Sequence, residues 1–290
     1  MPGILVIGAS GQLATALGRR GVRCVGRPAV DFDEPASLDA AIARAQPALV
    51  VNAAAWTAVD AAESAPEAAA RANADGPARL AALCAARGAP LIQISTDYVF
   101  DGLKGAPYTE ADPTNPTGVY GRTKLAGEEA ALARWERVTV LRTSWVYSPF
   151  GKNFVRTMLA AAERGAPLRV VADQRGCPTS AVDLADAVLL VAGRLLAGWQ
   201  PRYRGVFHAA GQGEATWHGF AVAIFSAADR QGRAVPEVTA IRTEDWPTPA
   251  RRPPDSRLDC TRLAETFGVR LPAWQESLDR TVEALLAPDA

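Results

Sequence analysis

The stretch "ILVIGASGQLA", residues 4–14, decides how the rest of the chain is interpreted. Four apolar residues lead into Gly8 and Gly11, and residues typical of a helix follow. Glycine lets the backbone turn sharply and approach a pyrophosphate, which binds to the free N–H groups of a helix N-terminus. Ala14 stands where a third small residue allows close packing of the helix. The stretch predicts a nucleotide-binding turn; the alternative is an ordinary strand-to-helix turn.

The first half of the chain alternates short apolar runs with alanine-rich helical stretches. The expected strands are residues 4–7, 22–25, 49–52, 91–95 and 138–142. The expected helices are residues 12–20, 38–45, 66–87 and 120–135, with Pro77 kinking the third or restarting it after Asp75-Gly76. Apolar runs without polar alternation suit strands buried on both faces. The pattern predicts an α/β fold with a doubly wound parallel sheet of the Rossmann type.

The alternation loosens after residue 150. We expect residues 1–150 to form a dinucleotide-binding domain and residues 151–290 to form mainly a smaller substrate-binding lobe. Segments near residues 165–225 are expected to return to the sheet, with 168–171 and 206–209 as candidate strands. The segment 243–259 is rich in proline and is expected to be irregular.

The composition excludes several classes of function. With 31 Lys and Arg against 31 Asp and Glu, the chain has no general attraction for nucleic acid or for an anionic membrane; the one basic candidate is "ARRP", 250–253. Four scattered cysteines favour a reducing compartment, and two histidines argue against a His/Cys metal site. We see no signal peptide, and the most apolar stretch, 182–199, carries three charges. We therefore expect a cytoplasmic protein without a metal.

The end of the second expected strand bears on the choice of cofactor. NAD-specific sites usually carry an acidic residue there, which holds the ribose hydroxyls. This strand ends in "CVGRP", which offers Arg27 and no carboxylate. A cation suits the 2′-phosphate of NADPH, so NADPH is favoured and NADH stays possible; the alternative is a solvated surface arginine. Asp31 and Phe32 follow and are expected to flank the adenine.

Tyr120 and Lys124 are four residues apart in "YGRTK", so they share one face at the head of a helix. A lysine charge about 4 Å from the phenol contributes roughly 4 kcal/mol at an effective dielectric near 20 and about 1 kcal/mol in water. The first value would lower the tyrosine pKa by about three, so the pair is effective only in a partly dry site. Thr96, at the carboxyl end of its strand, is the expected hydrogen-bonding neighbour.

Several stretches together resemble the extended short-chain dehydrogenase/reductase superfamily: "GASGQLA", "ISTDYVFDG" and "YGRTKLAGE". Within it, "VNAAAWTAVDAAE" (51–63), "RTSWVY" (142–147), "DQRGCPTS" (173–180) and "PTPARRPPDSRLD" (247–259) are similar to the dTDP-4-dehydrorhamnose reductase family. The matches span nearly the whole chain. The resemblance implies NAD(P)H-dependent reduction of the C4 ketone of dTDP-4-dehydro-L-rhamnose to dTDP-L-rhamnose.

The resemblance also implies roles for single residues. Tyr120 would donate the proton to the new C4 hydroxyl, and Lys124 would hold the nicotinamide ribose and tune Tyr120. The expected cofactor contacts are Gly8, Gly11, Gln12, Leu13, Arg27, Asp31, Phe32, Ala55, Trp56, Thr57, Tyr120 and Lys124. The expected substrate contacts are Thr96, Asp97, Trp145, Asn153 and Arg252, with Gln174 a weaker candidate. Trp56 departs from the family pattern, where Tyr or His is expected.

Some alternatives stay open. Tyr98 either shapes the pocket or is a packing residue, and Trp145 either contacts the sugar or belongs to the core. Arg251 and Arg252 either bind the substrate diphosphate or pair with Glu244, Asp245 or Asp255. His208 and His218 are expected to be structural.

Two other functions compete with the reductase. A 4,6-dehydratase or epimerase has the same fold, but dehydratases usually carry Asp-Glu after the threonine, and here Tyr98 follows Asp97. A non-catalytic NADP-binding regulatory subunit would not need Tyr120, Lys124 and Thr96, which are all present. The expected partner is a nucleotide sugar, and the chain is expected to act as a monomer or homodimer.

Overall fold

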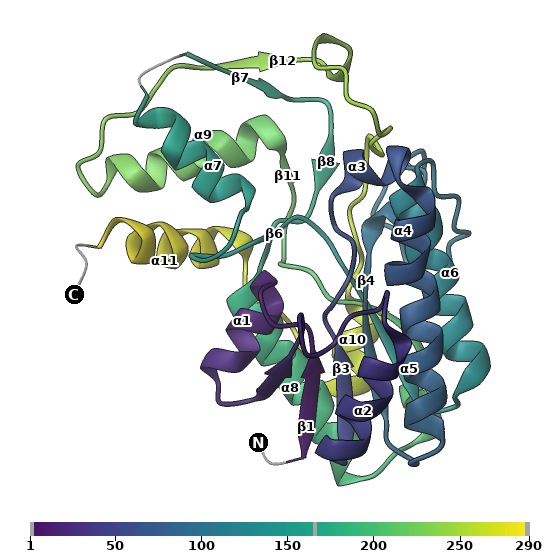
Figure 1. The fold of residues 1–290 in the computed structure, drawn as a ribbon. Coiled ribbons are helices and arrows are strands. Elements are labelled where there is room, and N and C mark those ends of the chain that lie inside the picture. The colour runs from purple at the N-terminus through teal and green to yellow at the C-terminus, as the bar shows by residue number, and fades with distance from the viewer. Residues whose placement is uncertain (1–2, 165–166, 288–290) are drawn as a thin grey trace.

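A six-stranded parallel sheet forms the centre of the computed structural model, which describes residues 3–164 and 167–287 (Figure 1). The strand order is β10-β5-β4-β3-β1-β2. The strands are β1 (Ile4–Ile7), β2 (Arg23–Val25), β3 (Leu49–Asn52), β4 (Leu91–Thr96), β5 (Val138–Thr143) and β10 (Gly205–His208). Every neighbouring pair runs parallel. The predicted doubly wound α/β fold is confirmed.

Helices cover both faces of this sheet because alternate strand residues point to opposite sides. Ile4 and Val6 face α1 (Gln12–Arg19), α8 (Ala181–Ala197) and α10 (Thr261–Phe267). Leu5 and Ile7 face α2 (Pro35–Ala45), α5 (Gly76–Ala85) and α6 (Val119–Arg134). The strands are therefore buried on both sides, as their unbroken apolar runs predict.

The third helical stretch is interrupted where the sequence predicts it. After α3 (Val59–Ser64), α4 (Pro66–Ala70) passes into a π-helical segment, η1 (Arg71–Asp75), and α5 starts at Gly76 with Pro77 in its first turn. A proline in the first turn removes no helical hydrogen bond. The widened turn buries the side chain of Asn73 near the ends of the strands, where it has a role described below.

The remaining elements build a smaller lobe beside the sheet (Figure 1). Its helices are α7 (Phe154–Ala162), α9 (Trp217–Asp229) and α11 (Trp274–Leu286). Its strands form three pairs: β6 (Val146–Tyr147) with β9 (Thr179–Ser180), β8 (Arg175–Gly176) with β11 (Ala215–Thr216), and β7 (Leu168–Val171) with β12 (Val238–Ile241). Short 3-10 turns complete the chain: η2 (Asp97–Val99), η3 (Pro201–Tyr203) and η4 (Thr243–Asp245).

The sequence analysis predicts that 168–171 and 206–209 return to the main sheet, and for one of these two segments the prediction is wrong. Residues 206–209 enter the main sheet, as β10 beside β5. Residues 168–171 instead pair with β12 in a separate two-stranded sheet, where Val170 packs in one cluster with Phe220 and Ile224 of α9. The main sheet ends at β10 on one side and at β2 on the other, and 168–171 adds to neither edge because it pairs with β12.

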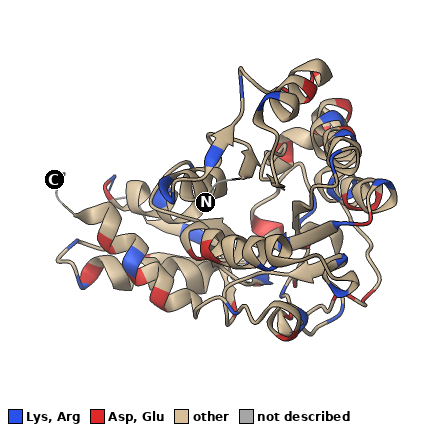
Figure 2. Ribbon diagram, turned by 90° about the horizontal axis from the view of Figure 1, so that it is seen from below, with Lys and Arg blue, Asp and Glu red and all other residues tan. Residues whose placement is uncertain are grey.

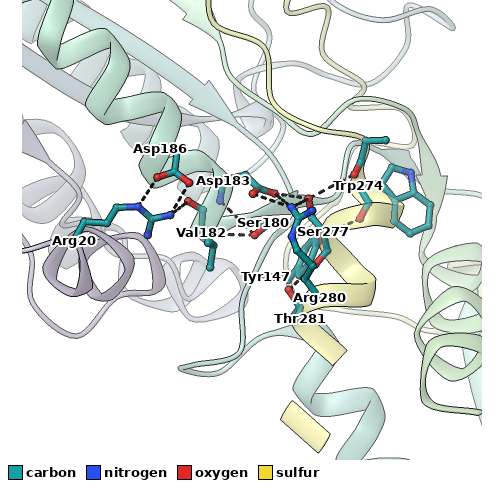
Figure 3. Close-up of polar contacts among 11 residues, drawn as sticks. Arg20, Tyr147, Ser180, Val182, Asp183, Asp186, Trp274, Ser277, Arg280 and Thr281 are labelled. Carbon is teal, nitrogen blue, oxygen red and sulfur yellow. Dashed lines mark hydrogen bonds and ion pairs between the residues drawn. The ribbon is translucent and has the colours of Figure 1, made fainter. Parts of the chain in front are cut away.

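Polar contacts of α8 join the main sheet's helical layer to the lobe (Figure 3). On one side, Arg20 binds Asp186 of α8 through two hydrogen bonds, one of 2.7 Å. On the other side, Asp183 accepts hydrogen bonds from Ser277 and from Arg280 of α11. Ser180 caps the N-terminus of α8, so the helix that carries both contacts is held at its start.

Basic and acidic residues are interspersed along the helices in the view of Figure 2. This agrees with the equal numbers of basic and acidic residues. Within residues 3–164 and 167–287, no helix is long and apolar enough to span a membrane, and no group of three or more His, Cys, Asp or Glu side chains could hold a metal ion.

The position of α6 depends on two glycines that allow a close approach. A Cβ at Gly121 would lie 2.2 Å from the carbonyl oxygen of Tyr98, and a Cβ at Gly127 would lie 1.9 Å from that of Asn73. Both distances are far below van der Waals contact, so only glycine lets α6 pack this tightly on η2 and η1. The helix that carries Tyr120 and Lys124 is thereby pressed against the end of β4.

We predict that Gly127→Ala lowers the free energy of unfolding by about 1–3 kcal/mol, because the added methyl group overpacks a close helix contact. Chemical denaturation measures the change. The matched control is Gly193→Ala in α8, where a Cβ meets nothing within 4 Å; this change should stabilise the protein by up to about 1 kcal/mol through helix propensity alone. Equal effects of the two substitutions would contradict the close approach of α6.

Candidate active site

A cavity of about 460 Å³ opens at the carboxyl ends of β1, β2 and β3. Its floor contains two glycines that no other residue can replace. Gly8 has φ +121°, and a Cβ there would lie 3.2 Å from the backbone of Ala53. A Cβ at Gly26 would lie 2.9 Å from the amide nitrogen of Ala9. The two glycines let neighbouring backbone segments approach closely, so the cavity floor at these positions is bare backbone, the kind of surface that a pyrophosphate needs.

The first turn of α1 faces this cavity. Gly11 is the N-cap residue of α1 and lines the cavity. The backbone N–H groups of the first helical turn have no partner within the helix. The side chains of Gln12 and Leu13 do not line it. Gln12 donates to the Val146 carbonyl at 3.1 Å and accepts from Ser148, and Leu13 is buried in the core. Any cofactor contact of Gln12 and Leu13 would therefore come from their backbone.

The cavity rim carries the predicted adenosine-binding residues. Arg27, Asp31 and Phe32 all line it. The Arg27 side chain is 70% exposed and its Nε lies 3.1 Å from an Asp31 carboxylate oxygen. An exposed guanidinium held at the rim suits a phosphate on the ribose, whereas the adjacent carboxylate suits a free ribose hydroxyl.

The loop after β3 closes the cavity with Ala55, Trp56 and Thr57. Trp56 is fixed by Asn73: its amide donates to Asn73 Oδ1 at 2.8 Å, and Asn73 Nδ2 donates back to the Trp56 carbonyl at 3.1 Å. Asn73 also donates to Thr123 of α6. The buried asparagine thus ties the cofactor cavity to the helix that carries Tyr120, a role that the sequence analysis missed.

Lys124 lies in a dry setting. Its side chain is 4% exposed, and its Nζ donates to the Ile94 carbonyl of β4 at 2.7 Å. Burial lowers the pKa of Lys124 to about 8, although the Glu128 carboxylate opposes this change. Glu128 itself is buried in a 2.6 Å ion pair with Arg142.

Tyr120 lies on the same face of α6 and packs in one cluster with Trp56 of the cofactor cavity. Burial raises the pKa of its phenol to about 12, with a lowering contribution from a hydrogen bond with Thr96 and a raising one from Asp97. The predicted lowering by Lys124 is not among these causes. In this structure the ammonium is turned to the Ile94 carbonyl, so Tyr120 is a protonated donor at neutral pH.

Thr96 ends β4 and Asp97 begins η2, and both interact with Tyr120. Thr96 Oγ1 donates to Asp97 Oδ1 at 3.1 Å and accepts from the Tyr98 amide at 3.2 Å. Burial raises the pKa of Asp97 to about 6, opposed by hydrogen bonds from Ser256 and Thr96. Its Oδ2 has no partner among the described residues. A buried carboxyl oxygen without a partner next to the acid is suited to accept a hydrogen bond from a ligand hydroxyl.

Tyr98 packs edge-on against Tyr120, with ring centroids 5.5 Å apart. Burial, followed by the nearby Asp97 charge, raises the pKa of Tyr98 well above its usual value, while the nearby Arg252 opposes this. Arg252 binds Asp60 of α3 at 2.9 Å. The suggested partners Glu244, Asp245 and Asp255 are therefore wrong for Arg252, because the 243–259 segment folds back over α3.

The remaining residues considered in the sequence analysis, Trp145, Asn153 and His208, each make contacts within the protein. Trp145 adopts φ +46° and stacks on Trp217 of the lobe. Asn153 is buried as the N-cap of α7, accepting from the Arg156 amide and donating to the Ser148 carbonyl at 2.9 Å, which gives it a structural role. His208 is buried, with its Nδ1 beside two carbonyl oxygens, and its Nε2 lacks a partner among the described residues.

Two further site residues were missed by sequence reasoning. Gly26 directly precedes Arg27 and carries no motif of its own, so only the approach of Ala9 reveals it. Asp60 lies inside the quoted stretch 51–63, where an exposed helix carboxylate gives no signal of a partner 192 residues away.

Comparison with known proteins agrees with this geometry. The family model described as "RmlD substrate binding domain" matches residues 1–287. A dTDP-4-dehydrorhamnose reductase from Sinorhizobium fredii is 47% identical, with 98% of this chain and 97% of the relative covered. The crystal structure of a dTDP-4-dehydrorhamnose reductase from Clostridium acetobutylicum has a TM-score of 0.89 at 38% identity, covering 98% of this chain and 99% of that one.

A third relative was solved with a cofactor. The dTDP-4-dehydrorhamnose reductase from Bacillus anthracis, crystallised in complex with NADP, has a TM-score of 0.88 at 30% identity, covering 96% of this chain and 97% of that chain. Since the family model and these relatives match the sheet and the lobe together, the chain belongs to the dTDP-4-dehydrorhamnose reductase (RmlD) family.

Proposed function

We infer that this chain is an NAD(P)H-dependent dTDP-4-dehydrorhamnose reductase, which reduces the C4 ketone of dTDP-4-dehydro-β-L-rhamnose to dTDP-β-L-rhamnose. The observation that carries this inference is the protonated Tyr120, which interacts with Thr96 and packs with Trp56 against one apolar cluster. Ketone reduction needs a hydride donor and a proton donor on one carbonyl. The inference is supported by Trp56, which lines the cavity proposed for the hydride donor and packs against the same cluster as Tyr120, the proposed proton donor.

The residues of the chain have separate tasks in this mechanism. The cofactor cavity would hold a reduced nicotinamide dinucleotide, whose chemistry would be hydride transfer to C4. We propose that Tyr120 donates its proton to the C4 oxygen as negative charge develops there, and that Thr96 and Asp97 hold the sugar. Lys124 would turn from the Ile94 carbonyl to the nicotinamide ribose, where its charge would lower the Tyr120 pKa and ease the proton transfer. Burial of Lys124 limits the screening of this charge by water.

Three further proposals concern the preferred cofactor, the division of the chain between cofactor and substrate, and the oligomeric state. We propose that NADPH is preferred over NADH, supported by the exposed Arg27 at the cavity rim. We propose that residues 1–150 with β10 hold the cofactor and that most of residues 151–290 hold the nucleotide sugar. We also propose that the protein works as a monomer or homodimer, which analytical ultracentrifugation would test.

The direct test is the fall in NADPH absorbance when dTDP-4-dehydrorhamnose is added, followed by identification of the sugar formed. Reduction to dTDP-rhamnose supports the inference. Tight NADPH binding without turnover would instead indicate a regulatory subunit. Release of water from dTDP-glucose without added NADPH would indicate a dehydratase.

We predict that Tyr120→Phe keeps NADPH affinity but lowers turnover by about 100-fold or more, the usual scale for loss of a general acid. Tyr98→Phe is the matched control, because it removes the neighbouring phenol in ring contact with Tyr120; its turnover should fall by less than about tenfold. A greater loss in Tyr98→Phe than in Tyr120→Phe would assign the proton donor to Tyr98.

We predict that Arg27→Ala weakens NADPH binding at least about tenfold more than NADH binding, since only NADPH carries the 2′-phosphate. Equilibrium titration with each cofactor measures this. Arg23→Ala, at the start of β2, the strand that precedes Arg27, lies outside the cavity lining and should change neither affinity. Equal weakening of both cofactors by Arg27→Ala would make Arg27 a bystander.

We predict that kcat/KM for NADPH falls as the pH rises through about 8, because kcat/KM reports ionisations of the free enzyme and Lys124 then loses its charge. The phenol of Tyr120, with its pKa near 12, stays protonated over this range. In Lys124→Met the residual activity should lack this limb. A wild-type profile that stays level through pH 10 would contradict the assignment.

A further inference from the structure

The helix that carries Tyr120 begins without a cap of its own. The N-cap residue of α6 is Gly118, which has no side chain to offer, and the first turn of the helix contains no acidic residue. The backbone N–H groups of a first turn have no partner within the helix, so they need an acceptor from elsewhere. Tyr120 is the second residue of α6, so its backbone lies in this weakly held turn.

The missing acceptor comes from α3. Glu63 Oε1 accepts a hydrogen bond from the amide of Val119 at 2.7 Å, although the two residues are 56 positions apart in the sequence. Val119 is the first residue of α6 and directly precedes Tyr120. A carboxylate at this place satisfies a free N–H group and is also favoured by the dipole of the helix. Glu63 therefore caps α6 from a different helix.

Gly118 makes room for this carboxylate. A Cβ at Gly118 would lie 2.8 Å from Glu63 Oε1, whereas its next neighbour, the Arg251 carbonyl oxygen, would lie at 3.9 Å. The backbone of Gly118 has φ −123° and ψ 168°, an extended conformation that any residue adopts. The glycine is thus needed for the approach of the carboxylate and not for the path of the chain.

The proline-rich segment after η4 braces this junction from the other side. Asp60 of α3 accepts a hydrogen bond from the Ala250 amide at 3.2 Å and pairs with Arg252 at 2.9 Å. Thr117, which leads into α6, donates to the Arg251 carbonyl at 3.3 Å. One segment therefore holds both α3 and the residue that precedes the N-cap of α6, so the two partners of the cap are fixed relative to each other.

Apolar contacts connect the junction to the candidate active site. Val119 is buried in one cluster with Ala62 of α3 and Ala69 of α4, and Trp56 and Tyr120 pack against this cluster. Trp56 also lines the cofactor cavity. Both α3 and α4 contact α6 (Figure 1). A shift at the start of α6 would therefore move the phenol relative to the cavity.

Lys124 is held in a different way from Tyr120. It lies in the second turn of α6, where backbone N–H groups have partners within the helix. Its Nζ also donates to the Ile94 carbonyl at 2.7 Å. Loss of the cap should therefore displace Tyr120 and leave Lys124 in place. The expected sign of a positioning role is a fall in turnover without a loss of cofactor affinity.

We propose that Glu63 is a positioning residue of the reductase, whose carboxylate fixes the first turn of α6 and thereby sets the place of the Tyr120 phenol. Glu63 acts through Val119 and not by contact with the sugar. The proposal rests on the proposed function for the role of Tyr120 as the proton donor. Displacement of a catalytic group by about 1 Å can cost about 100-fold in rate, so a cap at this turn matters for turnover.

The experiment compares turnover of the 4-keto sugar and equilibrium binding of NADPH in variants of the whole protein. Glu63→Ala should lower kcat at least about tenfold. Its Kd for NADPH should stay within about twofold of the wild-type value, because the loss is confined to catalysis. Glu63→Gln keeps an oxygen that can accept from the Val119 amide, so its kcat should stay within about threefold of wild type.

Asp259→Ala is the matched control. Asp259 accepts a hydrogen bond from the amide of Thr261, the first residue of α10, at the same distance of 2.7 Å. Its removal also takes a carboxylate from the start of a helix, but α10 carries none of the proposed site residues. Turnover of Asp259→Ala should therefore stay within about twofold of wild type, whatever stability the lost cap costs.

Gly118→Ala tests the same contact from the opposite side. The added methyl group would displace the Glu63 carboxylate and should lower kcat at least about threefold. In the Glu63→Ala background it meets no carboxylate, so it should cost less than about twofold. Equal losses in both backgrounds would overturn the proposal. If Glu63→Ala does not fold, Gly118→Ala alone decides, and unchanged turnover in it overturns the proposal.

A measurement without sugar separates this proposal from the proposed function. The NMR signal of the 13C-labelled Tyr120 phenol carbon should shift in Glu63→Ala and keep its wild-type position in Glu63→Gln and Asp259→Ala. If the wild-type protein does not reduce the sugar, the proposed function fails, and an unchanged signal in folded Glu63→Ala would still overturn the role of Glu63. If the sugar is reduced but Glu63→Ala turns over like wild type, or Asp259→Ala loses as much, the reaction stands and the role of Glu63 fails.

Discussion

The close contact of α6 with η1 and η2 is the constraint on which the site depends. It requires Gly121 and Gly127, because a Cβ at either position would overlap a backbone carbonyl. The contact brings Tyr120 to the end of β4 and buries Lys124 against the Ile94 carbonyl. The same helix carries Glu128, whose buried ion pair with Arg142 ties α6 to β5. The positions of the acid and the lysine thus follow from backbone packing before any charge is considered.

Burial has opposite consequences for these two groups, and both suit a proton donor that waits for its cofactor. It raises the pKa of Tyr120 to about 12, so the phenol holds its proton, and it lowers that of Lys124 to about 8, so the ammonium is only moderately stable. A free phenol with a high pKa is a weak acid. We infer that binding of the cofactor, by drawing the Lys124 ammonium toward the ribose and the phenol, supplies the missing acidity only in the productive complex.

Much of the fold could be predicted because its signals are local. The unbroken apolar strands, Gly8 and Gly11, and the restart of the helix at Gly76-Pro77 each act within a few residues. The place of 168–171 could not be predicted, since its pairing with β12 joins segments that are far apart in the sequence and has no local signal. The i,i+4 spacing correctly predicted that Tyr120 and Lys124 share a face. It could not predict the direction of the Tyr120 pKa, because burial is set by tertiary contacts of Gly121 and Gly127. The pairing of Arg252 with Asp60 joins distant segments and has no local signal.

The central claim is that Tyr120 holds its proton in the unliganded protein and that cofactor binding lowers its pKa while the phenol remains the proton donor. The most direct measurement is a pH titration of the ring-carbon NMR signal of Tyr120 in protein labelled with 13C at the phenol carbon. The chain has five tyrosines, and the signal is identified by its loss in Tyr120→Phe. Without cofactor, the account predicts that the signal is essentially unchanged at pH 10, the ordinary tyrosine pKa, and that it begins to move at lower pH when NADP+ is bound. A midpoint at or below 10 in the unliganded protein would contradict the account.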